Sequence, residues 1–176
     1  ESQFKQDGEK FIYFGDSIDI AFKVLAIKVK THSQEIKVLK QIPYESENKY
    51  SALFFEEKGK KYCTVKGSLE KVLSFSSNMK IDGEEVGLDN EKIQELNQEL
   101  AKRGYRVIAL AVGEIEYKTD YSEKDIQNLT FIGLVSFIDP IRPESKSSIK
   151  QCHSAGIKVI MITGDHPLTA FSIAKD

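Results

Sequence analysis

The hydrophobic positions between residues 35 and 67 recur in short runs that predict antiparallel strands. The runs at 35–44, 49–57 and 60–67 are rich in β-branched and aromatic residues, the composition typical of strands. Pro43 separates the first two runs, and Lys58-Gly59 separates the last two as a tight hairpin turn. The pattern therefore predicts three strands that follow one another through short connections, as antiparallel strands do.

Elsewhere the apolar positions follow the helical period. A mostly apolar run begins at Ile18 behind Asp16 or Ser17, either of which can cap a helix. A short helix is predicted behind Ser68. The clearest helix spans 90–103, because Ile93, Leu96 and Leu100 form one stripe, with Asp89 or Asn90 as the cap and Gly104 at the position of a left-handed helix end.

The last third of the chain predicts a different architecture. Residues 105–115 and 129–138 are expected to be strands, with a loop at 116–128. Pro143 and Gly156 then bound a predicted helix, 157–163 is a continuous apolar run, and Pro167 opens another helix. Strand, helix, strand and helix at this spacing indicate a parallel βαβα unit. We therefore predict an α+β chain, with an antiparallel sheet and flanking helices in a domain at 1–130 and a partial parallel βαβα unit at 131–176.

Composition and charge narrow the class of protein. The chain has 176 residues, of which 40% are hydrophobic and 30% charged, and a net charge of −2, values of an ordinary globular protein. Lysines and glutamates are interspersed, so no basic patch predicts a nucleic-acid partner. The longest uncharged stretch, 126–138, has thirteen residues, fewer than the ~20 of a membrane-spanning helix. Cys63 and Cys152 fit two reduced thiols, and we expect a cytoplasmic compartment.

Two short motifs follow the strands of the predicted parallel unit. They are Asp139 with Arg142, and Thr163-Gly164-Asp165. Parallel sheets bind ligands beyond the carboxyl ends of their strands, and a hydroxyl, a glycine and the free N–H groups of a helix start suit a phosphoryl group. The same residues also fit a capped helix and a surface ion pair, and three-residue motifs recur by chance. The residues alone leave both interpretations open.

The order of the motifs carries more information than any one of them. "GDSIDIAFKV", "IPYESENKYSALF", "YCTVKGSLEKVL", "RGYRVIALAV" and "DPIRPESKSSIKQCHSAGIKVIMITGDHPLTAFSIAKD" occur in this order. In sequence and spacing they resemble the cytoplasmic headpiece of P-type cation-transporting ATPases. The resemblance covers the chain from about Gly15 to its last residue, and the paired DPxR and TGD motifs are its most specific part.

The resemblance implies an ATP-binding domain inserted into a phosphorylation domain of haloacid-dehalogenase type. Tyr44 matches the aromatic residue that stacks on adenine, usually Phe in the family, and Lys49 matches a basic residue of the same pocket. Lys66 and Gly67 match the KGA motif, here KGS, deep in that pocket. Asp19 matches the acid near the adenine edge.

Further matches concern the phosphates. Arg106 matches an arginine that reaches the ATP phosphates, whereas Asn48 stands where the family often carries Arg. Thr163, Gly164 and Asp165 match the TGD loop that meets the phosphoryl group, and Asp139 and Arg142 match DPxR; these five are the implied catalytic residues. No residue of the chain is expected to bind a metal.

The sequence contains neither the D-K-T-G-T motif with the family's nucleophile nor the G-D-G-x-N-D motif that holds Mg²⁺. We therefore expect a piece of a longer pump, cut just after the first turns of a helix, that binds ATP or ADP without forming an aspartyl phosphate. The resemblance implies, as partners, the remaining phosphorylation, actuator and transmembrane domains of the same polypeptide, with Mg²⁺ in the full-length protein. It also implies a place at the cytoplasmic face of the cell membrane. The motif order looks most like calcium and related bacterial cation pumps, and the piece itself is expected to be a monomer or weak dimer.

Two other functions stay open at this point. A free-standing phosphatase of the haloacid-dehalogenase class needs an aspartate nucleophile after a parallel strand, and Asp139 is so placed, but Ile141 stands where a second acid is expected. A non-enzymatic interaction module would bind no nucleotide and would expose an apolar sheet edge that favours dimerisation.

Overall fold

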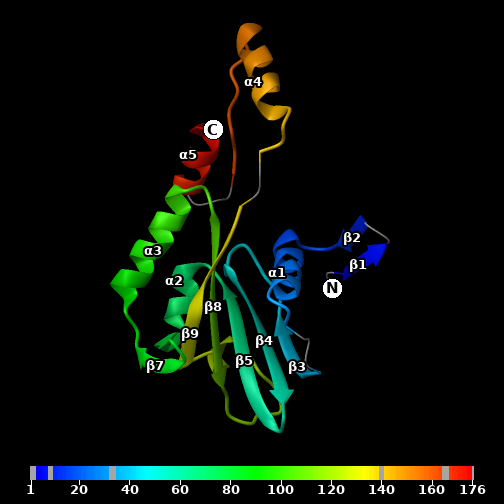
Figure 1. Cartoon of the computed structure of the whole chain (residues 1–176). Helices are drawn as coiled ribbons and strands as arrows, with labels where there is room; N and C mark the ends of the chain where they lie inside the picture. Colours follow the sequence, from blue (N-terminus) through cyan, green and yellow to red (C-terminus); the bar gives the residue numbers. More distant parts are fainter. Residues whose placement is uncertain (1–2, 8–9, 32–34, 139–140, 164–166, 176) are drawn as a thin grey trace. The chain divides into compact units, whose positions relative to one another are not determined.

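The computed structural model of the chain describes residues 3–7, 10–31, 35–138, 141–163 and 167–175. The chain divides into two units, residues 1–36 and 37–176. In the first unit a two-stranded antiparallel sheet precedes a helix, namely β1 (Gln3–Asp7), β2 (Lys10–Phe14) and α1 (Ser17–Lys28) (Figure 1). Asp16 caps α1 as predicted, because its carboxylate accepts hydrogen bonds from the backbone N–H groups of Ile18 and Asp19 at 2.9 and 3.2 Å.

Within the described residues of the second unit, seven strands form one sheet in the order β3-β4-β5-β8-β9-β6-β7. Neighbouring strands are antiparallel except for β6 and β9, which are parallel. This mixed, mostly antiparallel sheet with flanking helices confirms the predicted α+β class. Its strands are β3 (Lys37–Ile42), β4 (Tyr50–Glu57), β5 (Lys60–Gly67), β6 (Ser76–Ile81), β7 (Glu84–Gly87), β8 (Arg106–Glu114) and β9 (Leu129–Phe137).

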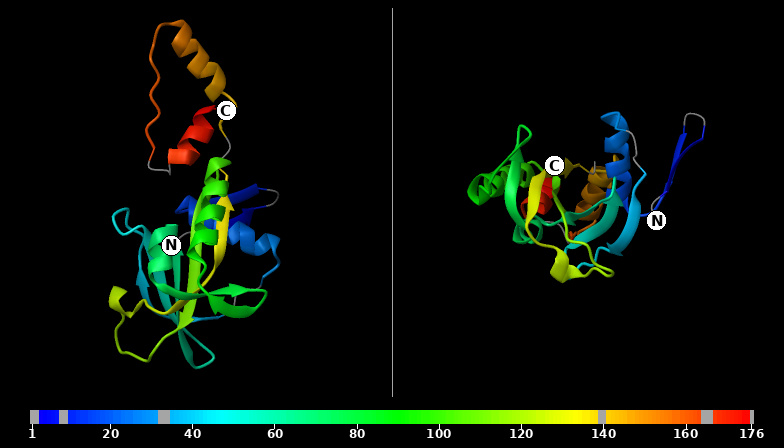
Figure 2. Two further views of the ribbon diagram at one scale, coloured as in Figure 1. Left: turned by 90° about the vertical axis from the view of Figure 1, so that its left-hand side faces the viewer. Right: turned by 90° about the horizontal axis from the view of Figure 1, so that it is seen from below.

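One face of this sheet carries the core. Tyr50, Ala52 and Phe54 alternate along β4 as buried residues, and their partners on β5 include the buried Cys63 and Val65. Two helices contribute to the same cluster of buried side chains: α2 (Leu69–Ser74) through Leu69 and Val72, and α3 (Asn90–Lys102) through Ile93 (Figures 1 and 2). Because side chains alternate along each strand, one face of the sheet carries the buried core and the other face carries the remaining side chains.

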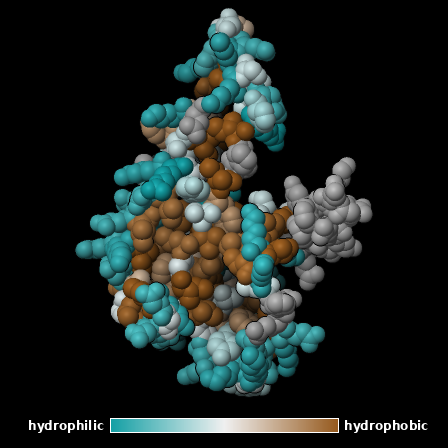
Figure 3. Space-filling view, viewed as in Figure 1, coloured by the Kyte–Doolittle hydropathy of each residue, from teal (hydrophilic) through white to brown (hydrophobic). Residues whose placement is uncertain are grey.

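The second face of the sheet is half-buried. It carries the alternate residues of the central strands, among them Leu53, Lys66, Leu110 and Val135. Figure 3 shows apolar side chains gathered over the strands of the large sheet. The predicted functional lysine, Lys66, therefore lies on the less buried face.

The predicted helix ends are confirmed in detail. Asp89 caps α3 by accepting a hydrogen bond from the Lys92 N–H at 3.1 Å. At the other end Gly104 has φ +82, and the N–H groups of Gly104 and Tyr105 donate to the carbonyls of Ala101 and Leu100. This pairing is a Schellman motif, whose left-handed residue favours glycine.

Two predictions about secondary structure need correction. Residues 157–163, predicted as a strand, form no strand within the described part of the chain, and Ile162 is 93% exposed. An apolar run becomes a strand only where a neighbouring strand satisfies its backbone groups, and here β9 instead joins the antiparallel sheet. Helix α4 (Ser145–Ser154) begins two residues after Pro143. The loop predicted at 116–128 is confirmed, and it contains a short 3₁₀ turn, η1 (Glu123–Asp125).

The predicted domain boundary after residue 130 stays a prediction. Strand β9 (Leu129–Phe137) crosses this position and pairs with β8 along most of its length. The helix predicted behind Pro167 is confirmed as α5 (Pro167–Lys175), and Gly156 follows α4 with φ +76, as expected for a helix end.

Two buried acids on the core face predict a loss of stability in alkali. Burial raises the pKa of the Cys63 thiol to about 12, and burial together with the Glu123 carboxylate raises the pKa of the Tyr50 phenol to about 12. In the unfolded chain both groups ionise at lower pH, so above that range the folded state holds more protons and the free energy of unfolding falls as pH rises. Urea unfolding should show constant stability up to about pH 8.5 and a decline toward about pH 12, starting from the ordinary thiol pKa.

The variants Cys63→Ala and Tyr50→Phe isolate the two contributions. Each substitution lowers stability at neutral pH, but each should also flatten the alkaline decline, because the group that must ionise is gone. A decline of unchanged steepness in both variants would show that other groups cause it.

Candidate functional site

Two predicted pocket segments that are far apart in sequence meet at one end of the sheet. The backbone N–H of Ser68 donates to the carbonyl of Lys49 at 2.9 Å, and Tyr50 pairs with Gly67 across β4 and β5. A side-chain carbon at Gly67 would overlap with the Lys49 carbonyl oxygen and would lie 2.8 Å from Cα of Tyr50. The segment at 43–49 and the Lys66-Gly67-Ser68 turn are therefore packed backbone to backbone, which only a glycine at position 67 permits.

The connection from β3 to β4 is a hydrogen-bonded turn. The N–H groups of Asn48 and Lys49 both donate to the carbonyl of Glu45, at 3.1 and 2.8 Å, and the Asn48 side-chain amide donates to the Glu45 carboxylate at 2.9 Å. Lys49 has φ +59, a left-handed conformation that is uncommon for a residue with a side chain. Tyr44, in this connection, is 61% exposed, so its ring face is accessible to a ligand.

Lys66 and Arg106 lie on the same face of neighbouring strands. Lys66 pairs with Leu110 across β5 and β8, and Arg106 lies four residues before Leu110 on β8. Even-numbered separations keep side chains on one face, and the two backbones are offset by about 14 Å along the strand at the usual rise. Two long cationic side chains on one face can neutralise different parts of an extended anion.

The remaining predicted residues belong to other parts of the chain. Asp19 lies in the first turn of α1, in the first unit. Arg142 and Thr163 are exposed in the segments that flank α4. Asp139, Gly164 and Asp165 lie outside the described residues, so the predicted catalytic set stays a prediction from the sequence.

Lys71 and Glu123, two side chains that the sequence did not predict, form an ion pair beside the Lys66-Gly67-Ser68 turn. Ser68 caps α2 by accepting a hydrogen bond from the Lys71 N–H at 3.4 Å, and the Lys71 ammonium contacts the Glu123 carboxylate at 2.8 Å. The same ammonium lies 5.2 Å from the ring centre of Tyr50, within the range of a cation–π contact. The hydrogen bond from Lys71 lowers the pKa of the Glu123 carboxyl. Lys71 and Glu123 are 52 positions apart in the sequence, so no local sequence pattern predicts their ion pair.

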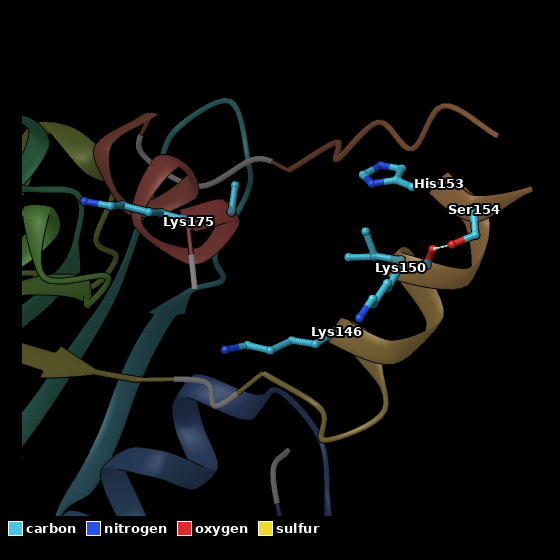
Figure 4. A pocket seen from close by; sticks show the side chains of 7 residues that line it. Lys146, Lys150, His153, Ser154 and Lys175 are labelled. Carbon is cyan, nitrogen blue, oxygen red and sulfur yellow. Dashed lines mark hydrogen bonds between the residues drawn. The ribbon is translucent and has the colours of Figure 1, made fainter. Parts of the chain in front are cut away.

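A separate hollow of about 570 Å³ lies between α4 and α5 and contains none of the predicted pocket residues. Its lining includes Lys146, Lys150, His153 and Lys175, the first three on one side of α4 (Figure 4). Within the described part of the chain, none of these four side chains forms an ion pair with a carboxylate. The hollow is wide open, and solvated surface lysines explain it without a ligand.

The fold is that of an α+β domain with a mixed, mostly antiparallel sheet and flanking helices, and comparison with known proteins places it in a family. The model of the P-type ATPase cytoplasmic domain N matches residues 1–144. The chain therefore belongs to the family of P-type ATPase cytoplasmic N domains.

Relatives from several organisms agree with this assignment. The chain is 36% identical over 182 residues to the cation-transporting ATPase pma1 of Synechocystis, and 35% identical over 181 residues to a calcium-transporting ATPase of Bacillus subtilis. These alignments cover 99% and 98% of the chain but 20% of each relative. The sodium/potassium-transporting ATPase subunit alpha-A of Artemia franciscana is 39% identical over 153 residues, which are 79% of the chain and 15% of that protein. The chain thus spans a fifth or less of the length of these relatives.

Two features are absent from the described residues. None of their helices combines the length and the apolar character needed to cross a lipid bilayer. Nor do three or more of their His, Cys, Asp or Glu side chains gather as ligands for a metal ion.

Proposed function

We propose that this chain is the nucleotide-binding domain of an ATP-driven cation pump and that it binds ATP and ADP at the end of the large sheet where β4 begins and β5 ends. The packing of Lys49 against Gly67 and Ser68 carries the proposal. It brings the Tyr44–Lys49 segment to the Lys66-Gly67 turn, two regions that match the family's pocket independently of each other.

Each proposed role follows from the chemistry of the side chain. An exposed aromatic ring such as that of Tyr44 can stack on adenine, a contact that contributes ~1–3 kcal/mol in nucleic-acid complexes. Lys66 and Arg106 supply positive charge on one sheet face, and the guanidinium group suits bidentate contact with phosphate oxygens. Asn48, bonded to Glu45, supplies no charge where the family often carries Arg, so we expect modest affinity.

The roles of the longer polypeptide are proposals of the same kind. The names of the relatives support ATP-driven cation transport, and the order of the motifs favours a calcium-type or related bacterial pump. In such a protein this domain would face the cytoplasm, and Asp139, Arg142 and the Thr163-Gly164-Asp165 loop would meet a phosphoryl group on an aspartate that this sequence does not contain. Mg²⁺ would accompany the nucleotide. The described chain is thus proposed to bind nucleotide and to leave hydrolysis to the rest of the protein.

The first test is a nucleotide titration of the chain and of Lys66→Ala. Isothermal titration calorimetry or NMR should show ATP binding between about 100 μM and about 1 mM, or about 4–6 kcal/mol. Removing the Lys66 charge should weaken ATP binding about 10- to 150-fold, because a hydrogen bond to a charged group contributes about 1.5–3 kcal/mol.

Lys60→Ala is the matched control. Lys60 lies on the same strand at its far end, where its ammonium contacts Glu114 at 2.8 Å on the surface, so its loss should leave the affinity unchanged. Absence of ATP binding by the parent chain would refute the proposed function. Equal losses of ATP affinity in the two variants would instead indicate a general effect of net charge and would refute the placement of Lys66 in the pocket.

A further inference from the structure

Helix α5 is attached to the sheet domain by a buried polar contact. Thr169 is 3% exposed, and its hydroxyl donates to the backbone carbonyl of Tyr105 at 3.1 Å. Figures 1 and 2 show α5 beside the end of α3, just before β8 begins. A buried hydroxyl is costly unless it is hydrogen-bonded, so this bond selects the position of α5 at the Gly104-Tyr105 turn.

The same turn contacts α5 a second time. Ser172 lies three residues after Thr169, on the same side of the helix. A side-chain carbon placed on Gly104 would lie 3.2 Å from the Ser172 hydroxyl oxygen. The absence of a side chain at position 104, which the left-handed φ of +82 also requires, therefore lets α5 approach the turn closely.

The carbonyl that Thr169 binds belongs to the peptide group that precedes Arg106. A peptide group is planar, so holding the Tyr105 oxygen also fixes the orientation of the Arg106 nitrogen, at the first residue of β8. Arg106 also pairs with Phe137 of β9, and the Thr169 contact adds a second constraint on the peptide group that leads into Arg106.

We infer that Thr169 is a positioning residue for Arg106: by docking α5 on the Gly104-Tyr105 turn, it orients the arginine that contacts the phosphates of a bound nucleotide. The inference rests on the proposed function, since it requires a nucleotide at Lys66 and Arg106. It also gives α5, the helix that follows Thr163 along the chain, a part in nucleotide binding by the sheet domain.

The test separates phosphate contacts from the rest of the pocket by comparing ATP with adenosine. Thr169→Val keeps the shape of the side chain and removes the hydroxyl. It should weaken ATP binding about 2- to 10-fold, the range that corresponds to one net hydrogen bond, and should leave adenosine binding unchanged. Thr169→Ser, which restores the hydroxyl, should bind ATP as the parent chain does. In an Arg106→Ala background, Thr169→Val should cause no further loss, as expected for two residues that act as one.

A second variant covers the case in which Thr169→Val does not fold. Ser172→Leu crowds Gly104 and displaces α5 while leaving residue 169 intact, so it should produce the same ATP-selective loss. If the parent chain binds no ATP, the proposed function fails. If the parent binds ATP but the variants weaken ATP and adenosine equally, or weaken neither, Thr169 is a structural residue and the positioning role is refuted.

Discussion

Replacing Gly67 with alanine should both destabilise the sheet and strongly weaken the proposed binding of nucleotide. The added carbon would meet backbone atoms, the carbonyl oxygen of Lys49 and Cα of Tyr50, rather than a flexible side chain. Because neither backbone can move without opening the β4–β5 pairing, we expect a loss of about 1–3 kcal/mol or more in the free energy of unfolding, the range of overpacked cores.

The Gly67→Ala variant should lose ATP affinity even under conditions where it remains folded. Movement of Lys49 away from position 67 breaks the bond from the Ser68 N–H and shifts the turn that carries Tyr44. Since the pocket needs both segments in place, ATP affinity should fall more than about tenfold even at temperatures where Gly67→Ala is folded. Urea unfolding and calorimetric titration at about 15 °C, well below thermal unfolding, measure the two effects separately.

Gly87→Ala is the matched control for this prediction. Gly87 also lies in a strand, β7, but a carbon added there meets no atom within 4 Å. Alanine should therefore be tolerated at position 87, with unchanged stability and ATP affinity. A Gly67→Ala variant as stable as Gly87→Ala would show that the close approach of Lys49 is not fixed in solution.

The local elements of the fold could be predicted from the sequence because their signals are local. Asp16, Ser68 and Asp89 are the caps that the sequence suggests, and Gly104 ends α3 in the left-handed conformation. The sequence holds a further local signal. The Asp82-Gly83 pair, with φ +50 and +91, turns the β6–β7 hairpin, and an Asp-Gly pair between apolar runs is a strong hairpin signal.

The pairing of distant segments could not be predicted in the same way. Ser76 of β6 lies beside Leu129 of β9 in the parallel pair of the sheet. The sequence of neither segment indicates that it pairs with the other. The run at 157–163 shows the converse, since its apolar residues fit a strand but the described chain supplies no neighbour for it. The hydrophobic period and the composition are properties of a single segment, whereas a strand also requires a second segment to pair with.

The candidate site also has a part that the sequence predicts and a part that only the structure shows. The residue types at positions 44, 49, 66, 67 and 106 followed from the resemblance to the family. The left-handed backbone of Lys49, the Ser68–Lys49 hydrogen bond and the Thr169–Tyr105 contact depend on segments that meet only in the folded chain. What the sequence predicts is therefore a set of chemical groups, and what the structure adds is the reason that some of them converge.

The second large effect concerns the core behind the pocket, at Phe54. The ring of Phe54 is fully buried and stacks on Tyr121, with ring centres 4.8 Å apart and an angle of 19°. Tyr121 in turn holds the 116–121 segment, because its hydroxyl donates to the Glu116 carbonyl and accepts from the Lys118 N–H. Phe54→Ala should therefore lower the free energy of unfolding by about 3–5 kcal/mol, the cost of removing a buried aromatic ring.

Phe55→Ala tests whether that cost comes from the face of the sheet or from the residue type. Phe55 is the next residue along β4, lies on the half-buried face and stacks on Tyr62 at 5.6 Å. Its removal should cost about 1 kcal/mol, since only part of its apolar surface leaves water on folding. Hydrogen exchange should also rise at 116–121 in Phe54→Ala alone, because only that variant frees Tyr121. Equal losses of stability in the two variants would contradict the assignment of the core face. They would also contradict the placement of Lys66 on the accessible side of the sheet.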